Sequence, residues 1–282
     1  MYILFDIGGT NTRVARSRDL ASFDHMVKYK TPKDFDEGIE KFVATAQELA
    51  GDETIEMIAG GIAGPLDAEK TMPVGGPNIL GYHNKPLKME LQQRLGAPVF
   101  LENDASMGTL GEANFGAGKE YRVVVYMTIS TGVGGGKTVD GVLSPSADGF
   151  EPGWQIVDAG NTLCEGCSER GYLIDYISGA SVEKRHGKKP YEITDKDFWD
   201  EKARLLAYGL NNIAVIWSPD IIVLGGSMMK EIGIPVESTR KYLKEVLHIF
   251  PEPPIVEKAV LGDELGLYGA MAYLKQKREN GK

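Results

Sequence analysis

A buried β-strand that runs into a glycine-rich turn occurs twice in this sequence, once near residue 8 and again near residue 132. The first is the apolar run Tyr2–Ile7 before Gly8-Gly9, after which Thr12–Arg16 resumes as a strand. The second is Arg122–Ile129, which leads into the run Ser130–Gly136. Each opens a β-rich half with helices behind it, so we expect two similar α/β domains facing each other across a cleft.

Apolar periodicity and turn residues indicate the remaining elements of each half. Apolar side chains recur at helical spacing from Phe35 to Leu49, which predicts an amphipathic helix. Asp140-Gly141 is a typical hairpin turn pair. The other predicted strands are His25–Thr31, Ile55–Ile62, Val99–Leu101, Val139–Leu143 and Ile221–Leu224, and the other predicted helices are Leu87–Leu95, Ala105–Phe115, Phe198–Ile216 and Leu265–Lys277.

The charge distribution argues against a nucleic-acid partner. The net charge is −9, and no basic stripe runs along the chain. The densest basic stretch, Lys184–Lys189, reads as a solvated loop, with an anion site as the less favoured alternative.

Cysteine usage and hydropathy indicate the compartment. The two cysteines, Cys164 and Cys167, make no disulfide framework and fit a reducing environment. The N-terminus lacks signal-peptide features, and no apolar run approaches the roughly 20 residues that span a bilayer. We therefore expect a cytoplasmic protein without a membrane partner.

The first glycine turn has the composition of a phosphate-binding loop. Gly8 and Gly9 permit positive φ and let the backbone approach an anion closely, while Thr10, Asn11 and Thr12 add side-chain donors. Asp6 ends the strand and can hold Mg²⁺ through water. A plain hairpin turn is the alternative, and the polar residues around the glycines favour the phosphate loop.

Two further glycine turns lie in the second half. The run Ser130–Gly136 offers amides and hydroxyls to phosphates, including those of Thr131 and Gly132. It is neither a Walker A loop nor a dinucleotide fingerprint. Gly225-Gly226-Ser227 follows a buried strand, where bare backbone could pack against adenine, although a tight strand-to-helix turn explains it equally well.

A polar tripeptide, Glu102-Asn103-Asp104, ends the strand Val99–Leu101. Active sites of α/β proteins lie at the carboxyl ends of strands. A carboxylate there can accept the proton of a hydroxyl that attacks a phosphoryl group. From these three residues alone, a helix N-cap is the favoured role for Asp104.

Together these motifs resemble the ROK family, which contains repressors and sugar kinases. The matching segments, in order, are Asp6–Arg13 (DIGGTNTR), Gly64–Asp67 (GPLD), Pro77-Asn78, Leu101–Ala105 (LENDA), Gly132–Gly136 and Leu224–Gly226. The resemblance covers residues 2 to 272 and implies two ribonuclease-H-like domains, as in the actin-like ATPases, with a cleft between them. The N-terminal domain would hold residues 1–115 and a C-terminal helix at about 266–282, with the first phosphate turn and the sugar-binding loops. Residues 116–265 would carry the second phosphate turn and the adenosine site.

The resemblance assigns a role to each candidate site residue. It implies an ATP- and Mg²⁺-dependent sugar kinase in which Asp104 is the general base. The implied sugar contacts are Asn78, Asn103, Asp104, Glu151 and Trp154. The implied nucleotide contacts are Asp6, Gly8, Gly9, Thr10, Asn11, Thr12, Thr131, Gly132, Gly225 and Gly226, with Asp6 holding Mg²⁺.

One segment departs from the family pattern. Trp154 replaces the usual histidine, Tyr172 replaces a cysteine, and Ile174 replaces a sugar-contacting glutamate. With two of four ligands left, we expect no structural zinc. We expect burial of Trp154 and Tyr172 to hold the segment instead.

These departures leave the substrate open. The resemblance implies a glucokinase-like enzyme acting on the 6-hydroxyl of a hexose. The alternatives are an N-acetylglucosamine or N-acetylmannosamine kinase, a sugar-binding regulator without catalysis, and an ATP-driven scaffold. The first strand begins at Tyr2, so we expect no DNA-binding helix-turn-helix before it. A homodimer is the family's usual state.

Overall fold

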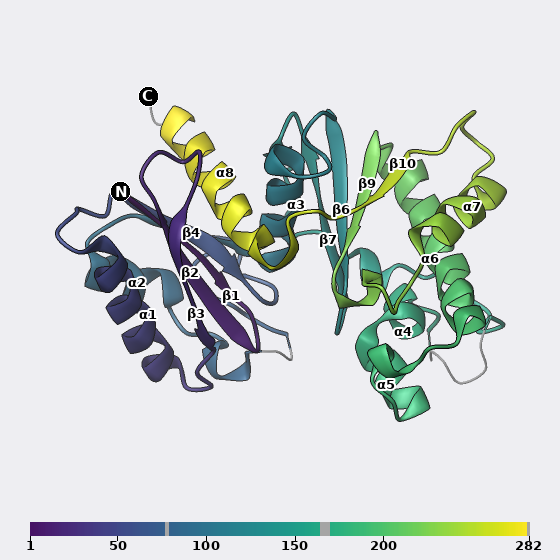
Figure 1. The fold of residues 1–282 in the computed structure, drawn as a ribbon, viewed down its shortest axis with the longest axis horizontal. Coiled ribbons are helices and arrows are strands. Elements are labelled where there is room, and N and C mark those ends of the chain that lie inside the picture. The colour runs from purple at the N-terminus through teal and green to yellow at the C-terminus, as the bar shows by residue number, and fades with distance from the viewer. Residues whose placement is uncertain (77–78, 164–169, 281–282) are drawn as a thin grey trace. The chain divides into compact units, whose positions relative to one another are not determined.

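A computed structural model describes residues 1–76, 79–163 and 170–280. The chain divides into two compact units (Figure 1). Unit 1 comprises Met1–Phe115, Val142–Gly149 and Leu261–Lys282, and unit 2 comprises Gly116–Gly141 and Phe150–Val260.

The sheet of unit 1 is mixed, and its strands run in the order β3-β2-β1-β4-β5. Strand β1 pairs antiparallel with β2 and parallel with β4, which in turn pairs parallel with β5. The bounds are β1 (Tyr2–Ile7), β2 (Asn11–Ser17), β3 (Asp24–Lys30), β4 (Met57–Ile62) and β5 (Val99–Asn103).

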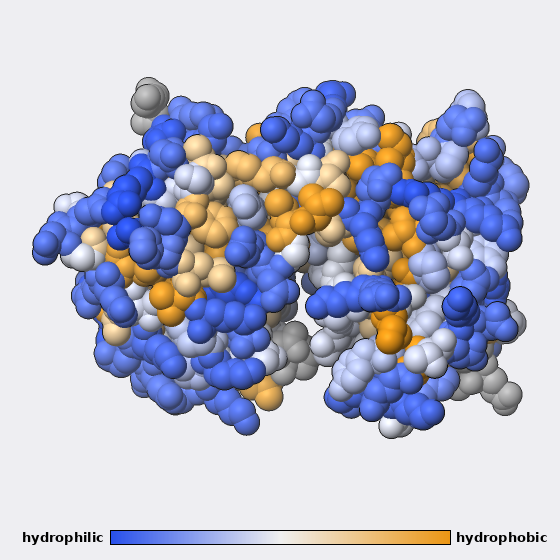
Figure 2. Space-filling model, viewed as in Figure 1, coloured by the Kyte–Doolittle hydropathy of each residue, from blue (hydrophilic) through white to orange (hydrophobic). Residues whose placement is uncertain are grey.

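Helices pack against both faces of this sheet. Ile3 and Phe5 of β1 pack in one core with α1 (Phe35–Ala50) and α2 (Leu87–Leu95), whereas Tyr2 and Leu4 pack in another with α3 (Asp104–Phe115) and α8 (Leu265–Asn280). The two-residue alternation of strand side chains produces this division. The outward face of α1 is hydrophilic (Figure 2), as its amphipathic pattern predicts. A short 3₁₀ turn, η1 (Leu80–Tyr82), precedes α2.

Glycines allow α3 and α8 to pack closely. A Cβ atom at Gly269 would lie 1.9 Å from the Met107 carbonyl oxygen, and one at Gly111 would lie 2.6 Å from that of Leu265. Any larger side chain at either position would force the two helices apart.

The sheet of unit 2 is also mixed, in the order β10-β9-β6-β7-β8. Strand β6 pairs antiparallel with β7 and parallel with β9. The predicted hairpin turn is present, because Asp140 and Gly141 both have positive φ, of 53° and 73°. The strands are β6 (Val123–Ile129), β7 (Val133–Val139), β8 (Val142–Leu143), β9 (Ile221–Gly225) and β10 (Ile255–Lys258).

Long helix α6 forms most of the helical core of unit 2, where its Leu206 and Leu210 pack with Val125 and Ile222 of the sheet. The helices are α4 (Leu173–Ile177), α5 (Gly179–His186), α6 (Lys196–Trp217) and α7 (Val236–Val246), and the 3₁₀ turns are η2 (Pro152–Trp154), η3 (Pro190–Glu192) and η4 (Ser227–Met229). Turn η5 (Gly262–Glu264) precedes α8 in unit 1. Two mixed sheets with helices confirm the predicted α/β class.

One predicted loop is partly helical. Lys184–Lys189 was expected to be a solvated loop, but its first three residues form the last turn of α5. Gly187 then ends the helix with φ of 63° and donates its N–H to the Glu183 carbonyl. Across the described residues, none of the helices is long and apolar enough to cross a membrane.

Candidate functional site

Three parallel strands bring the polar motifs of unit 1 to one edge of its sheet. Ile7 at the end of β1 is in register with Ile62 of β4, and Ile62 is in register with Asn103 of β5. The turn after Asp6 and the start of α3 at Asp104 therefore lie at the same edge, about 10 Å apart across two strand spacings. Gly61 makes room between them, since a Cβ there would lie 3.1 Å from the Asp104 Cα.

Asp6 is partly buried at this edge, with 17% of its side chain exposed, and it pairs with a cation. Arg13 of β2 donates to Asp6 Oδ2 at 3.0 Å through Nη1, and to Asp263 Oδ2 at 3.0 Å through Nη2. Burial raises the pKa of Asp6, and the Arg13 charge only partly offsets this. A Cβ at Gly266 would lie 3.1 Å from the Asp6 Cγ, so α8 begins directly against this carboxylate.

Replacing Arg13 with methionine is expected to destabilise the protein by about 3 kcal/mol at pH 8, because a largely desolvated carboxylate loses its partner. Without Arg13 the pKa of Asp6 rises further. A carboxyl whose pKa is higher in the folded than in the unfolded protein adds most to the free energy of unfolding at pH values below its unfolded-state pKa. That contribution is lost as the pH rises through the folded-state pKa. The loss should therefore be smaller at pH 5 than at pH 8.

Urea unfolding of the wild type and the Arg13→Met variant at both pH values measures this difference. Arg18→Met is the control, since Arg18 makes an exposed pair with Glu53 and should cost about 0–1 kcal/mol at either pH. An equal loss for Arg13→Met at the two pH values would contradict the coupling to Asp6.

The N-cap of α3 is Asn103, not Asp104 as the tripeptide alone suggested. Asn103 Oδ1 accepts from the backbone N–H groups of Ala105 at 2.9 Å and Ser106 at 3.3 Å. Its Nδ2 donates to the Gly64 carbonyl at 2.9 Å, which ties the loop after β4 to α3. Asp104 is the first residue of the helix, and its Oδ1 accepts from the Ala105 N–H at 2.9 Å. Because Asn103 is the cap, the Asp104 side chain is not needed to cap α3.

The loop after β4 is fixed to the same strand end. Asp67 accepts from the Thr71 and Met72 N–H groups at 2.6 and 2.8 Å, which closes a turn. Within that turn Lys70 has φ of 52°, and its ammonium pairs with the buried carboxylate of Glu102. This contact was not expected from sequence, because no pattern links the two residues. Asn78, a predicted sugar contact farther along this loop, lies outside the described residues.

The turn between β6 and β7 lies beside the end of β9 in unit 2. Thr128 is in register with Gly225, and the hydroxyls of Ser130 and Ser227 lie 3.0 Å apart. Two backbone N–H groups from the start of α5 are directed to this turn. Gly179 donates to the Ser130 carbonyl at 2.7 Å, and Ala180 donates to the Thr131 carbonyl at 3.1 Å. The structure thus places Thr131, Gly132, Gly225 and Gly226 together.

Gly225 and Gly226 are required by close packing. A Cβ at Gly225 would lie 2.6 Å from the Tyr126 hydroxyl oxygen. Gly226 has φ of 94°, and a Cβ there would lie 2.2 Å from the Ile129 carbonyl oxygen. Packing within unit 2 therefore requires glycine at both positions, as a tight turn after β9 would. Contact with a nucleotide here stays a prediction.

The Glu151–Trp154 turn packs on the start of β7. A Cβ at Gly153 would lie 2.4 Å from the Val133 carbonyl oxygen, and one at Gly135 would lie 2.9 Å from the Pro152 ring. Gly135 of the second glycine run therefore accommodates this turn. Glu151 itself is exposed, and partial desolvation of its carboxyl raises its pKa.

Trp154 is not buried as expected, since 55% of its surface is exposed. Its ring lies edge-on to that of Tyr172, with centroids 5.3 Å apart. Asp158 instead anchors the following chain, because its carboxylate accepts from the Tyr176 hydroxyl at 2.9 Å and from the Leu163 N–H at 2.8 Å. Burial opposes ionisation of Asp158, but these hydrogen bonds lower its pKa overall. Cys164 and Cys167 lie outside the described residues.

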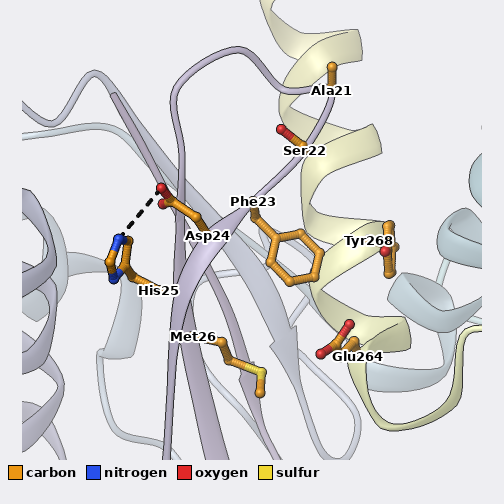
Figure 3. A pocket seen from close by; sticks show the side chains of 8 residues that line it. All are labelled: Ala21, Ser22, Phe23, Asp24, His25, Met26, Glu264 and Tyr268. Carbon is orange, nitrogen blue, oxygen red and sulfur yellow. Dashed lines mark ion pairs between the residues drawn. The ribbon is translucent and has the colours of Figure 1, made fainter.

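A separate hollow lies in unit 1 between the start of β3 and the start of α8 (Figure 3). Its volume is about 330 Å³, and Phe23 and Tyr268 line it with ring centroids 5.0 Å apart. Asp24 on its rim is already paired with Arg16 at 2.8 Å. None of the sequence-predicted site residues lines it, so it lies apart from the candidate site.

The chain is similar to known sugar kinases in sequence and in fold. The chain is 28% identical to a glucokinase of Thermotoga maritima, covering 96% of both chains. It is 28% identical to an N-acetyl-D-glucosamine kinase of Mannheimia succiniciproducens, covering 95% of this chain and 97% of that one. The solved structure of a ROK family glucokinase from Streptomyces griseus, in complex with glucose and AMPPNP, matches with a TM-score of 0.78 and 27% identity over 98% of this chain and 99% of that one. Residues 2–277 match the ROK family, and the chain belongs to that family.

Proposed function

We propose that this chain is an ATP-dependent sugar kinase that transfers the γ-phosphoryl group of ATP to the 6-hydroxyl of a hexose, with Asp104 as the general base. One observation carries the assignment of the base. The carboxyl ends of β1, β4 and β5 share one edge, and Asn103 caps α3, so Asp104 stands at the end of β5 without serving as the cap. The similarity to a glucokinase solved with glucose and AMPPNP supports ATP as the donor.

Each polar group of the site has a proposed role in phosphoryl transfer. Asp104 accepts the proton of the attacking hydroxyl, while Asn103 and Glu151, with Asn78, hydrogen-bond the sugar and Trp154 lies against it. Catalysis of phosphoryl transfer depends mainly on positioning and on charge stabilisation.

The nucleotide contacts follow the three glycine turns. In unit 1, Gly9, Thr10 and Asn11 offer donors to phosphate oxygens. Gly8 and Thr12 shape the turn instead, because the Gly8 N–H donates to the Asn11 carbonyl at 3.0 Å and the buried Thr12 hydroxyl lies 3.0 Å from that of Thr31. In unit 2, Thr131 and Gly132 do the same, and Gly225 and Gly226 present bare backbone to the adenosine. Asp6, fixed by Arg13, suits a hydrated Mg²⁺, which would neutralise phosphate charge when bound.

An N-acetylhexosamine is the second candidate substrate. Ile174 stands where the family has a sugar-contacting glutamate, and Trp154 stands where it has a histidine. An exposed tryptophan offers an apolar face that a glucose hydroxyl would not use but an acetamido methyl group could. The similarity to an N-acetyl-D-glucosamine kinase supports the same alternative.

A coupled ADP-release assay with ATP and Mg²⁺ tests the function across glucose, mannose, fructose, N-acetylglucosamine and N-acetylmannosamine. The proposal predicts release that depends on one of the sugars, with glucose giving the highest kcat/KM. Release that does not depend on sugar would instead identify an ATPase. Sugar binding without release would identify a regulatory protein.

A further inference from the structure

A group of cations lies where the C-terminal end of α5 meets the first turns of α6 in unit 2. Arg185 and His186 come from α5, and Lys202 comes from α6. The imidazole ring of His186 lies edge-on to Phe198 with centroids 5.1 Å apart, and the Lys202 ammonium lies 5.0 Å from the same ring's centroid. One aromatic ring therefore contacts both an imidazole and an ammonium group.

Lys202 is buried without a counterion. Only 3% of its surface is exposed, and within residues 1–76, 79–163 and 170–280 its ammonium contacts the Phe198 ring but forms no ion pair. Such a cation–π contact stabilises by about 0.5–2 kcal/mol, whereas removing an ammonium from water costs several kcal/mol. The cation–π contact therefore offsets only part of the free energy that burying the Lys202 charge costs.

Neighbouring positive charges add to the cost of keeping Lys202 protonated. Burial lowers the pKa of Lys202, and the charges of Arg185 and Arg204 lower it further, while Glu201 alone opposes them. Burial also lowers the pKa of His186, with Arg185 and Lys202 adding to the effect. Asp175 and Glu201 partly offset the charge of Arg185. Two further carboxylates of these helices are engaged elsewhere, since Glu183 pairs with Lys189 at 2.6 Å and Asp200 accepts from the Tyr242 hydroxyl, and Asp197 lies in the first turn of α6.

Helix dipoles do not account for Lys202. Cations in the last turn of a helix are stabilised by its dipole, which explains Lys184, Arg185 and His186 at the end of α5. Lys202 instead lies in the second turn of α6, nearer the positive end of that helix. The guanidinium of Arg185 is held by the carbonyls of Ser181 and Tyr176, at 3.2 Å each, so its charge is fixed in place.

We propose that Lys202, His186 and Arg185 form a binding site for a phosphate group, separate from the glycine turns. A phosphate group carries up to two negative charges and several acceptor oxygens, so it can pair with the ammonium and the imidazole together. His186 is exposed, which gives the anion a path from solvent. Figure 2 shows mainly hydrophilic residues over α5, as expected for a site open to a small ion.

Thermal unfolding of the full chain, with inorganic phosphate or with sodium chloride at equal ionic strength, tests the site. Phosphate at about ten times its Kd should raise the Tm of the wild type by about 3 °C. In Lys202→Met the rise should fall below about 1 °C, because the principal charge is gone. The same variant should match or exceed the wild-type Tm without phosphate, since an uncompensated buried charge has been removed.

The matched control is Lys196→Met, which makes the same change on the exposed first residue of α6 and should respond to phosphate as the wild type does. A full phosphate response in Lys202→Met would overturn the proposal and place phosphate elsewhere on the protein. A second result would also overturn it: phosphate does not raise the Tm of the wild type, and Lys202→Met has a lower Tm than the wild type in chloride. Lys202 would then be a purely structural residue.

A second variant tests the role of His186, and a second ligand tests which phosphate compound binds. His186→Gln, on the exposed side of the group, keeps the test decisive if Lys202→Met does not fold, and it should weaken phosphate binding several-fold in calorimetric titration. Glucose 6-phosphate and glucose serve as the comparison pair. A response to inorganic phosphate identifies a free-phosphate site, and a response to the sugar phosphate alone identifies a site for phosphorylated metabolites. An unchanged phosphate affinity in His186→Gln would contradict the assignment.

Discussion

Replacement of Asp104 with asparagine is expected to lower kcat for sugar phosphorylation by about 10²- to 10⁴-fold. The amide has the size of the carboxyl, and its oxygen can still accept from the Ala105 N–H as Asp104 Oδ1 does at 2.9 Å. The start of α3 should therefore be preserved because Asn103 caps it. The variant loses the ability to take the hydroxyl proton but keeps the size of the side chain, so the Kd values for sugar and ATP should change little.

Steady-state kinetics, with calorimetric titration of sugar and nucleotide, separates the two effects. Asp36→Asn is the matched control, since Asp36 is an exposed acid in the first turn of α1 and should leave kcat unchanged. Wild-type turnover in Asp104→Asn would remove this residue from the role of base. A large fall in sugar affinity with a small fall in kcat would make it a binding residue instead.

Gly226→Ala should produce the second large effect, a loss of nucleotide binding of at least about 100-fold together with a loss of stability of about 3–5 kcal/mol. The backbone at this position has φ of 94°, and the added methyl group would meet the Ile129 carbonyl oxygen at 2.2 Å. Since Ile129 immediately precedes the β6–β7 turn, any shift that relieves the clash displaces both proposed nucleotide turns of unit 2.

Gly187→Ala provides a control with the same chemical change. Gly187 also has positive φ, of 63°, but a Cβ added there would meet no atom within 4 Å. Its substitution should cost about 1 kcal/mol and leave nucleotide affinity unchanged. Fluorescence titration with a labelled ATP analogue compares the two variants. Similar nucleotide affinities in both would contradict the role of the Gly226 turn.

Local patterns predicted the elements that carry the site. The β1–β2 hairpin with its glycine turn, the Asp140-Gly141 turn and the amphipathic helix α1 all follow from periodicity and turn chemistry within a few residues. The strand before Asp104 was recognised in the same way. These features depend on residues that are neighbours in sequence, so local sequence patterns are enough to predict them.

Features that depend on distant residues were missed or assigned incorrectly. Arg13 donates to Asp263, which is 250 residues away in sequence, and no local pattern predicts that contact. The cap of α3 was assigned to Asp104 rather than Asn103, because helix ends shift by one residue without changing the pattern. Trp154 was expected to be buried and to hold its segment in place of a zinc ion, yet it is exposed. The following chain is held by Asp158, whose partners become neighbours only in the fold.

The most direct test of the account is ³¹P nuclear magnetic resonance of the purified protein with ATP, Mg²⁺ and glucose, with N-acetylglucosamine in a parallel sample. Phosphoryl transfer to a sugar should make the γ-phosphate signal of ATP decline while a sugar 6-phosphate ester signal grows by the same amount. Growth of an inorganic phosphate signal instead, or unchanged ATP in both samples, would contradict transfer to a sugar.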